Sequence, residues 1–149
     1  MPISGDAGFL LDTNVISEPS RPQPDPRVMA WLAAADEDRI FLSVATLAEI
    51  SRGITRLPAG KRRRQLEAWL VDDLPVRFDG RILGVDVEVG MAWGRLVARS
   101  EFAGHRIEAI DALLAATAEQ HNLTLVARNV ADFATTGVPI LNPWSATTP

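Results

Sequence analysis

Four acidic residues, spread along the chain, carry the chemistry that this sequence could perform. The first, Asp12, directly follows the apolar run Phe9–Leu11 and precedes Thr13 and Asn14. A short continuous apolar run is typical of a strand buried on both faces. In open α/β sheets ligands bind outside the carboxyl ends of the strands, so we expect Asp12 at the mouth of a central strand. The alternative is that Asp12 only caps a helix or forms a turn.

The other three acids are Glu49, Asp111 and Asp132. Asp111 shares a helix face with Leu114, and an acid on an apolar face is costly unless it is paired or binds a metal. Glu49 lies on a predicted helix beside the small residue Gly53, which leaves space above a carboxylate. Asp132 follows a second predicted strand. Taken alone, Glu49 could be a solvated helix residue and Asp132 a cap for the following turn.

Four converging carboxylates repel one another and raise their own pKa values, and a divalent cation reverses that repulsion. Oxygen ligands suit Mg²⁺ or Mn²⁺, and the chain has no cysteine. The two histidines, His105 and His121, fall near predicted helix ends and are interpreted as structural or exposed. The chemistry that this donor set indicates is metal-assisted hydrolysis of a phosphodiester.

Composition limits the class of protein. The chain has 149 residues, of which 47% are hydrophobic and 23% charged, and a formal net charge of −4. We expect one domain over residues 1–149. The negative charge argues against a general basic clamp for nucleic acid. The absence of cysteine, of a signal peptide and of a long apolar run predicts a soluble protein of the reducing cytoplasm, without a membrane segment.

The acids are positioned by a predicted alternation of strands and helices. Strands are expected at residues 9–11, 39–42, 81–85, 123–127 and 138–141. Helices are expected at 27–32, 44–57, 61–74, 86–100 and 107–121, with Ser43 and Asp86 as N-caps. The prolines of segment 17–26 forbid a regular helix there. This alternation is typical of an α/β fold with a central parallel sheet of four to five strands flanked by α-helices.

Several motifs carry a resemblance to a known family. They are Leu10-Leu11-Asp12-Thr13-Asn14, Ala48-Glu49-Ile50 with Arg52-Gly53, Ile110-Asp111-Ala112-Leu113-Leu114-Ala115-Ala116-Thr117-Ala118, and Arg128-Asn129-Val130-Ala131-Asp132-Phe133. Together they resemble the PIN-domain ribonucleases, and more closely the VapC-type toxins of bacterial toxin–antitoxin pairs. Residues 57–64 and 138–144 resemble the branch typified by FitB. The resemblance extends from Phe9 to Trp144.

The resemblance implies a PIN-like fold and a Mg²⁺-dependent endoribonuclease in which Mn²⁺ can substitute. It implies a homodimer, an RNA substrate, a cognate VapB-like antitoxin that silences the enzyme, and contact with DNA only through that antitoxin. Asp12 and Asp111 would be the direct metal ligands. Glu49 and Asp132 would act through water or complete a second metal site.

Three further residues take roles from the same resemblance. Thr13 would form a hydrogen bond near the metal, and Asn129 would orient a neighbouring carboxylate. Ala127 departs from the family, which often has a hydroxyl residue at this position. If that hydroxyl helps to place a water or Asp12, the activity of this chain is lowered.

A basic cluster, Lys61–Arg64, begins one predicted helix, where cations oppose the helix dipole. This mismatch favours a phosphate-binding role over a merely solvated helix start, since RNA affinity comes largely from backbone charge. Arg27, Arg52 and Arg56 could extend the cluster. Segment 17–26 and the helices that contain Leu47 and Lys61 are expected to form an apolar groove for the antitoxin. Four tryptophans favour a homodimer, because Trp is enriched at interfaces.

Two other functions compete with the ribonuclease hypothesis. One is a phosphatase that uses Asp12 as nucleophile, as haloacid-dehalogenase-like enzymes do, but their pattern requires an acid where Asn14 stands. The other is a non-catalytic toxin-like co-repressor. The intact acids argue against it, whereas Ala127 is compatible with it.

Overall fold

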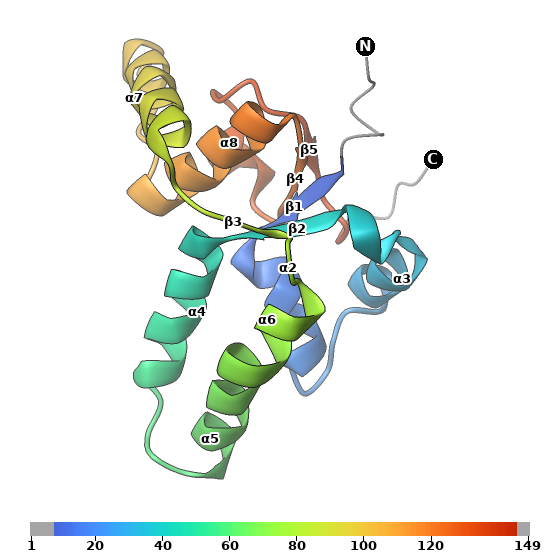
Figure 1. Ribbon diagram of the computed structural model, residues 1–149. Helices are drawn as coiled ribbons and strands as arrows, with labels where there is room; N and C mark the ends of the chain where they lie inside the picture. The colour runs from blue at the N-terminus through green and yellow to red at the C-terminus, as the bar shows by residue number, and fades with distance from the viewer. Residues whose placement is uncertain (1–7, 146–149) are drawn as a thin grey trace.

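The fold is built around a parallel five-stranded sheet, seen edge-on at the centre of Figure 1, a computed structural model. The structure describes residues 8–145. The strands are β1 (Phe9–Leu11), β2 (Ile40–Ser43), β3 (Ile82–Leu83), β4 (Thr124–Val126) and β5 (Ile140–Leu141). Their order is β3-β2-β1-β4-β5, and every neighbouring pair is parallel. The α/β class expected from the sequence is confirmed.

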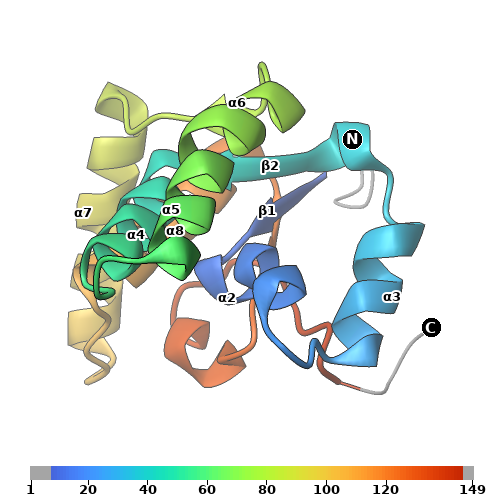
Figure 2. The ribbon, with the colours of Figure 1, turned by 90° about the horizontal axis from the view of Figure 1, so that it is seen from below.

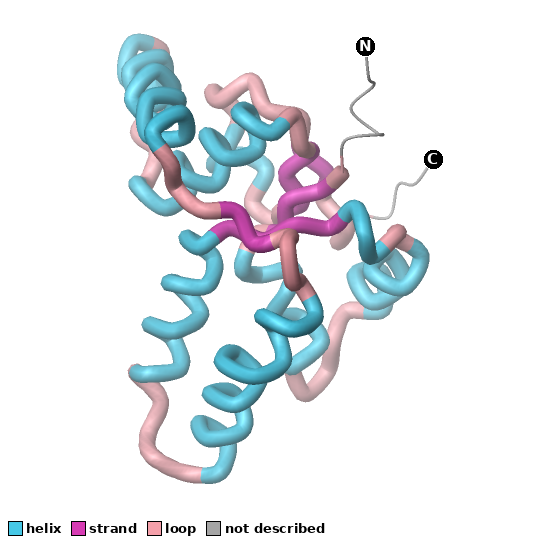
Figure 3. The backbone as a smooth tube through the Cα atoms, in the orientation of Figure 1, coloured by secondary structure: helices cyan, strands magenta, loops and turns pink. Residues whose placement is uncertain are grey.

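Helices cover both faces of the sheet, as the tube in Figure 3 makes plain. In Figure 1, α7 and α8 lie above the sheet, and the remaining labelled helices lie below it. In chain order the helical segments are α2 (Thr13–Ser17), η1 (Glu18–Ser20), α3 (Pro26–Ala34), η2 (Glu37–Arg39), α4 (Val44–Thr55), α5 (Lys61–Ala68), η3 (Trp69–Asp73), α6 (Leu74–Arg77), α7 (Val87–Phe102), α8 (Ala109–His121) and η4 (Val130–Phe133). Among the described residues, no helix is long and apolar enough to cross a membrane.

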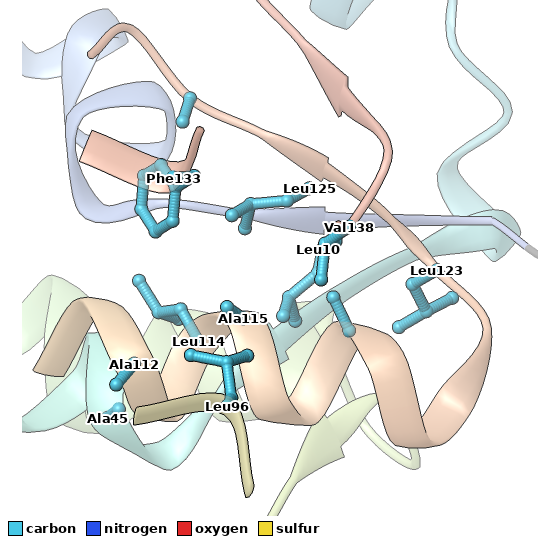
Figure 4. Close-up of a cluster of buried hydrophobic side chains, with 12 residues drawn as sticks. Leu10, Ala45, Leu96, Ala112, Leu114, Ala115, Leu123, Leu125, Phe133 and Val138 are labelled. Atoms are coloured by element: carbon cyan, nitrogen blue, oxygen red, sulfur yellow. The ribbon is translucent and has the colours of Figure 1, made fainter. Parts of the chain in front are cut away.

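The strand residues alternate between two apolar cores, as the period of two along a strand requires. Leu10 of β1 and Leu125 of β4 point to the α8 side, where they pack with Leu114, Ala115 and Phe133 (Figure 4). All five side chains are at most 1% exposed. Alanines on α8 allow this helix to lie close to the sheet, which fixes the position of Asp111 in its first turn.

The other core lies on the opposite face, against the helices that Figure 2 shows from below. Leu11 and Val126, the neighbours of Leu10 and Leu125, belong to this core together with Ile50 of α4. Leu74 and Phe78 belong to the same core and are fully buried. Because both faces of β1 are covered, its three residues are all apolar and its polar residues begin only where the strand ends.

The helix starts follow the sequence signals closely. Ser43 accepts a hydrogen bond from the backbone N–H of Ala45, and Asp86 accepts one from that of Val89, as expected of N-caps. Segment 17–26 holds only the end of α2 and the short 3-10 turn η1 before α3 begins at Pro26. Glu18 organises this segment, since its buried carboxylate accepts the backbone N–H of Asp25 at 2.7 Å.

The helix expected at residues 61–74 extends to Arg77, with a π-helical segment, η3, inside it. In this segment the N–H of Leu74 bonds to the carbonyl of Trp69, five residues earlier. Pro75 follows at once and has no N–H to donate, so the regular i→i−4 ladder cannot continue through it. The strands expected at 81–85, 123–127 and 138–141 are each shorter in the structure, because pairing with a neighbour ends before the apolar run does.

Candidate active site

Asp12 directly follows β1, the central strand. The chain places β2 and β3 on one side of β1 and β4 and β5 on the other, so the sheet order changes direction between β1 and β4. The N–H of Asp12 donates to the carbonyl of Val126 at 2.9 Å, and its Oδ1 accepts the N–H of Thr13 at 2.7 Å, so it also caps α2. The two interpretations made from the sequence, strand mouth and helix cap, are therefore both correct. The residue is only 8% exposed.

The pKa of Asp12 is raised from 3.8 to about 6. Burial is the largest cause, and the charges of Glu49 and Asp132 act in the same direction. The hydrogen bond from the N–H of Thr13 opposes them. The fold thus holds the Asp12 carboxylate in an environment that disfavours its negative charge.

Asp111, in the first turn of α8, is half-buried and has a similar environment. Its pKa is also raised to about 6, first by burial and then by the charges of Asp12, Asp132, Glu49 and Glu108. The sheet order therefore brings the four acids from distant parts of the chain within electrostatic range of one another. Leu114, Ala115 and Ala118, which share the helix face of Asp111, are fully buried as expected, and Asp111 itself is half-buried at the start of that face.

Glu49 is held from α2 rather than from its own helix. The hydroxyl of Thr13 donates to Glu49 Oε1 at 2.6 Å. This bond joins the turn after β1 to the middle of α4 and fixes the half-buried carboxylate next to Asp12. The expected hydrogen bond of Thr13 at this site is present, with Glu49 as its acceptor.

A cavity of about 440 Å³ opens beside these acids. It is lined by Ala48, Glu49, Arg52, Glu108, Ile110 and Asp111. Glu108 was missed by the sequence reasoning, although its place three residues before Asp111 puts it on the same side of the helix start. The cavity thus combines three carboxylates with one guanidinium.

Asp132 stands at the rim of the site. It is exposed on η4, and its N–H donates to the carbonyl of Asn129 at 3.0 Å. Within residues 8–145 the side chain of Asn129 makes no hydrogen bond, so the expectation that it orients a carboxylate has no counterpart in this geometry. Ala127 is fully buried against the α8 core.

The acids suit a hard divalent cation bound mostly through water. In the part of the chain that the structure describes, no three acidic or histidine side chains are close enough together to hold a metal ion by themselves. Mg²⁺ usually binds through one or two carboxylates and keeps several waters. Two buried or half-buried carboxylates with raised pKa values, Asp12 and Asp111, fit that mode. His105 lies just beyond the C-terminal end of α7, and His121 is the last residue of α8, so both are near helix ends as expected.

Half of the Lys61–Arg64 cluster is engaged in structural contacts. Arg62 donates to the carbonyl of Ser20 at 2.9 Å, and Arg63 donates to that of Leu57 at 3.2 Å. Arg63 also pairs with Glu67. These bonds tie the start of α5 to its surroundings, which gives two of the four cations a role that needs no phosphate.

A second cavity, of about 250 Å³, lies on the other side of Glu49. Its walls come from α2 and η1, from α4 and the residue Leu57 beyond it, and from Leu66 and Trp69. These are the three segments from which an apolar groove was expected, and Thr13 and Glu49 connect the groove to the acidic site.

Comparison with known proteins adds four findings. A model of the PIN domain matches residues 9–138. Toxin FitB of Neisseria gonorrhoeae is 41% identical over 136 residues, which cover 91% of this chain and 98% of that protein. VapC ribonuclease Y4jK of Sinorhizobium fredii is 36% identical over 136 residues, covering 91% and 97%. A solved structure of FitAB bound to an IR36 DNA fragment matches at a TM-score of 0.89 and 38% identity, covering 94% of this chain and 98% of that one.

Proposed function

The chain belongs to the PIN-domain family, and we propose that it is a metal-dependent endoribonuclease that acts as the toxin of a toxin–antitoxin pair. The family expectation drawn from the sequence is confirmed. The activity is supported by the likeness to a VapC ribonuclease and to toxin FitB. The observation that supports the metal dependence is the pair Asp12 and Asp111, which are buried or half-buried within electrostatic range of Glu49 and Asp132, so that burial and these neighbouring acids raise both pKa values.

In this proposal the four acids act as two pairs. Asp12 and Asp111 bind the cation directly, and Glu49 and Asp132 act through water or at a second metal. Thr13 holds Glu49 by a bond of 2.6 Å, so that this carboxylate does not have to be ordered when the cation binds. When bound, the cation supplies Lewis-acid stabilisation and activates water for phosphodiester hydrolysis. Mg²⁺ is the proposed ion, with Mn²⁺ as a substitute, because every candidate ligand is an oxygen.

The test is cleavage of total RNA by protein purified free of any partner, in Mg²⁺, in Mn²⁺ and in EDTA. We expect cleavage with either metal and none in EDTA. Asp111→Asn should abolish it, because the neutral amide cannot ligate the cation as a carboxylate does. Asp72→Asn removes the same charge from an exposed residue of η3 and is the matched control. Cleavage in EDTA, or wild-type cleavage by Asp111→Asn, would contradict the metal-site proposal.

The proposed partner is a VapB-like antitoxin, supported by the FitAB structure, in which a relative's complex is bound to DNA. A tail of this antitoxin would lie in the cavity of about 250 Å³ and extend an arginine to the acids beyond Glu49. Guanidinium binds carboxylates in a bidentate manner. This chain, with its net charge of −4, would reach DNA only through the antitoxin.

A synthetic antitoxin tail tests this partner directly. We expect excess Mn²⁺ to weaken its inhibition of RNA cleavage, because arginine and metal compete for the same carboxylates. Replacing the basic residue of the tail by alanine should weaken binding. Inhibition that is insensitive to both changes would locate the contact away from the acidic site.

The two competing functions make different predictions. A phosphatase would form a phospho-aspartate at Asp12, but the residue two positions on is Asn14, an exposed amide that cannot act as a general acid. A non-catalytic co-repressor would bind the antitoxin and fail to cleave RNA with any metal. The cleavage assay therefore separates the co-repressor from the ribonuclease, and acid-quench trapping of the phosphoryl group tests the phosphatase.

A further inference from the structure

Arg52 is the cation of the acidic cavity, and the described part of the chain leaves it unpaired. It lies on α4 one turn after Glu49 and lines the cavity of about 440 Å³ together with Glu49, Glu108 and Asp111. Its side chain is exposed and makes no ion pair or hydrogen bond with residues 8–145. A guanidinium with five donors and no acceptor is therefore present among three carboxylates without being neutralised by any of them.

The geometry of Glu49 explains why it does not form an ion pair with Arg52. Glu49 and Arg52 are spaced i,i+3 with the acid nearer the helix N-terminus, which is a favourable arrangement for an ion pair. Instead, Glu49 Oε1 accepts the hydroxyl of Thr13 at 2.6 Å and is held toward Asp12. The carboxylate of Glu49 is thus held by the hydroxyl of Thr13, and the guanidinium of Arg52, which lines the same cavity, stays available to a ligand.

A cavity lined by carboxylates from α4 and from the start of α8, with an arginine from α4 among them, suits one class of ligand well. A phosphodiester has two non-bridging oxygens, and it can meet a carboxylate-bound cation with one of them and a guanidinium with the other. Acids alone would repel RNA, whereas a single arginine supplies local positive charge and a planar fork of donors that matches phosphate. Arg56, the C-cap residue that follows α4, does not line this cavity.

We propose that Arg52 is a substrate-binding residue that holds a backbone phosphate of the RNA inside the acidic cavity. This inference rests on the proposed ribonuclease function and specifies how that site recognises its substrate. It assigns RNA binding to the wall of the cavity itself, rather than to the Lys61–Arg64 cluster, in which two side chains already serve structural contacts.

The experiment measures RNA binding separately from cleavage. Fluorescence anisotropy of a labelled single-stranded RNA of mixed sequence is recorded in Mg²⁺, with Asp12→Asn in every protein to prevent cleavage. Arg52→Ala should raise the Kd roughly tenfold, the lower end of what a charge-assisted hydrogen bond contributes. The slope of log K against log salt should become shallower by about 0.7, the value for one lost phosphate contact on a single strand.

Arg56→Ala is the matched control, because it removes the same charge from the C-cap of the same helix, outside the cavity. Its Kd should change much less than that of Arg52→Ala. Arg52→Lys keeps the charge but not the fork of donors, so it should retain the salt slope and bind with intermediate affinity. Circular dichroism of each variant verifies that the helical content of the protein is retained.

Equal effects of Arg52→Ala and Arg56→Ala on Kd and on salt slope would overturn the inference, because both would then act only through general charge. Failure of the proposed function is recognised in a different assay, as the absence of RNA cleavage by the wild-type protein with Mg²⁺ or Mn²⁺. A wild-type protein that cleaves RNA, with an Arg52→Ala variant that binds like Arg56→Ala, would leave the ribonuclease in place and remove Arg52 from its substrate site.

Discussion

Replacing Asp12 by asparagine should stabilise the metal-free protein at high pH. In the folded chain the pKa of Asp12 is about 6, against an ordinary value of 3.8. The folded state therefore binds the proton more tightly than the unfolded state, and stability falls as pH rises from about 3.8 to about 6. A gap of about two pH units, at about 1.4 kcal/mol for each, corresponds to about 3 kcal/mol. The residue is 8% exposed, so solvent does little to reduce this cost.

Asparagine removes the charge and keeps the local geometry. Its side-chain oxygen can still accept the N–H of Thr13, and Asn is as good an N-cap as Asp. We therefore expect Asp12→Asn to raise the free energy of unfolding by about 3 kcal/mol at pH 8. At pH 4, where Asp12 is protonated in the folded chain, the gain should shrink to about 0.5 kcal/mol.

Thermal unfolding followed by circular dichroism in EDTA measures this difference. For a chain of this length about 3 kcal/mol corresponds to an increase in Tm of roughly 6–12 °C at pH 8. Asp72→Asn, which removes an exposed charge from η3, should leave Tm nearly unchanged. Adding Mn²⁺ should stabilise the wild type and reduce the advantage of the variant, because the cation binds only the folded carboxylates. A variant no more stable than wild type at pH 8, or equally stabilised at pH 4 and pH 8, would refute the reasoning.

Three further predictions concern the hydrogen bond at Glu49, proton competition and assembly. Thr13→Val removes the hydroxyl that donates to Glu49 at 2.6 Å, so it should lower RNA cleavage and cost about 1 kcal/mol of stability. Thr13→Ser keeps the hydroxyl and should retain both the activity and the stability. A fully active Thr13→Val would show that this bond is dispensable. At limiting Mn²⁺ the cleavage rate should fall below about pH 6, because protons then occupy Asp12 and Asp111, and added metal should restore it; a rate that ignores metal concentration there would contradict this. Light scattering at micromolar concentration should give twice the 16.2 kDa chain mass; a stable monomer would exclude the homodimer.

The reason for expecting a homodimer changes with the structure. Trp144 is 7% exposed, and the other three tryptophans are half-buried within the monomer. The four tryptophans are therefore largely packed within the monomer, and their number is no longer the main argument for a dimer. Large exposed apolar side chains occur elsewhere, on η3, α6 and the start of α7: Val71, Val76, Val87 and Met91 are 62–77% exposed. These residues are the better argument for a contact between two copies.

The sequence by itself determined the local features of this protein. The apolar run before Asp12 is a strand buried on both faces, and Ser43 and Asp86 cap helices, because strand burial and capping depend on residues close together in the chain. The order of motifs was enough to identify the family. Proline also acts locally. Pro75 lacks an N–H, so an interruption of the helix hydrogen bonds at this residue could be predicted from the sequence, whereas the π-helical segment before it could not.

Only the tertiary structure decided how the acids meet. Thr13 and Glu49 are 36 residues apart, and no local propensity indicates that the hydroxyl of one is the partner of the other. Likewise, the unpaired state of Arg52 and the place of Glu108 in its cavity follow from how α4 and the start of α8 pack across the sheet. Periodicity specifies which face of an element is buried, but the distance between two faces depends on strand order, here β3-β2-β1-β4-β5. That order brings Asp12 beside Val126 and places the charges of four remote acids within reach of one another.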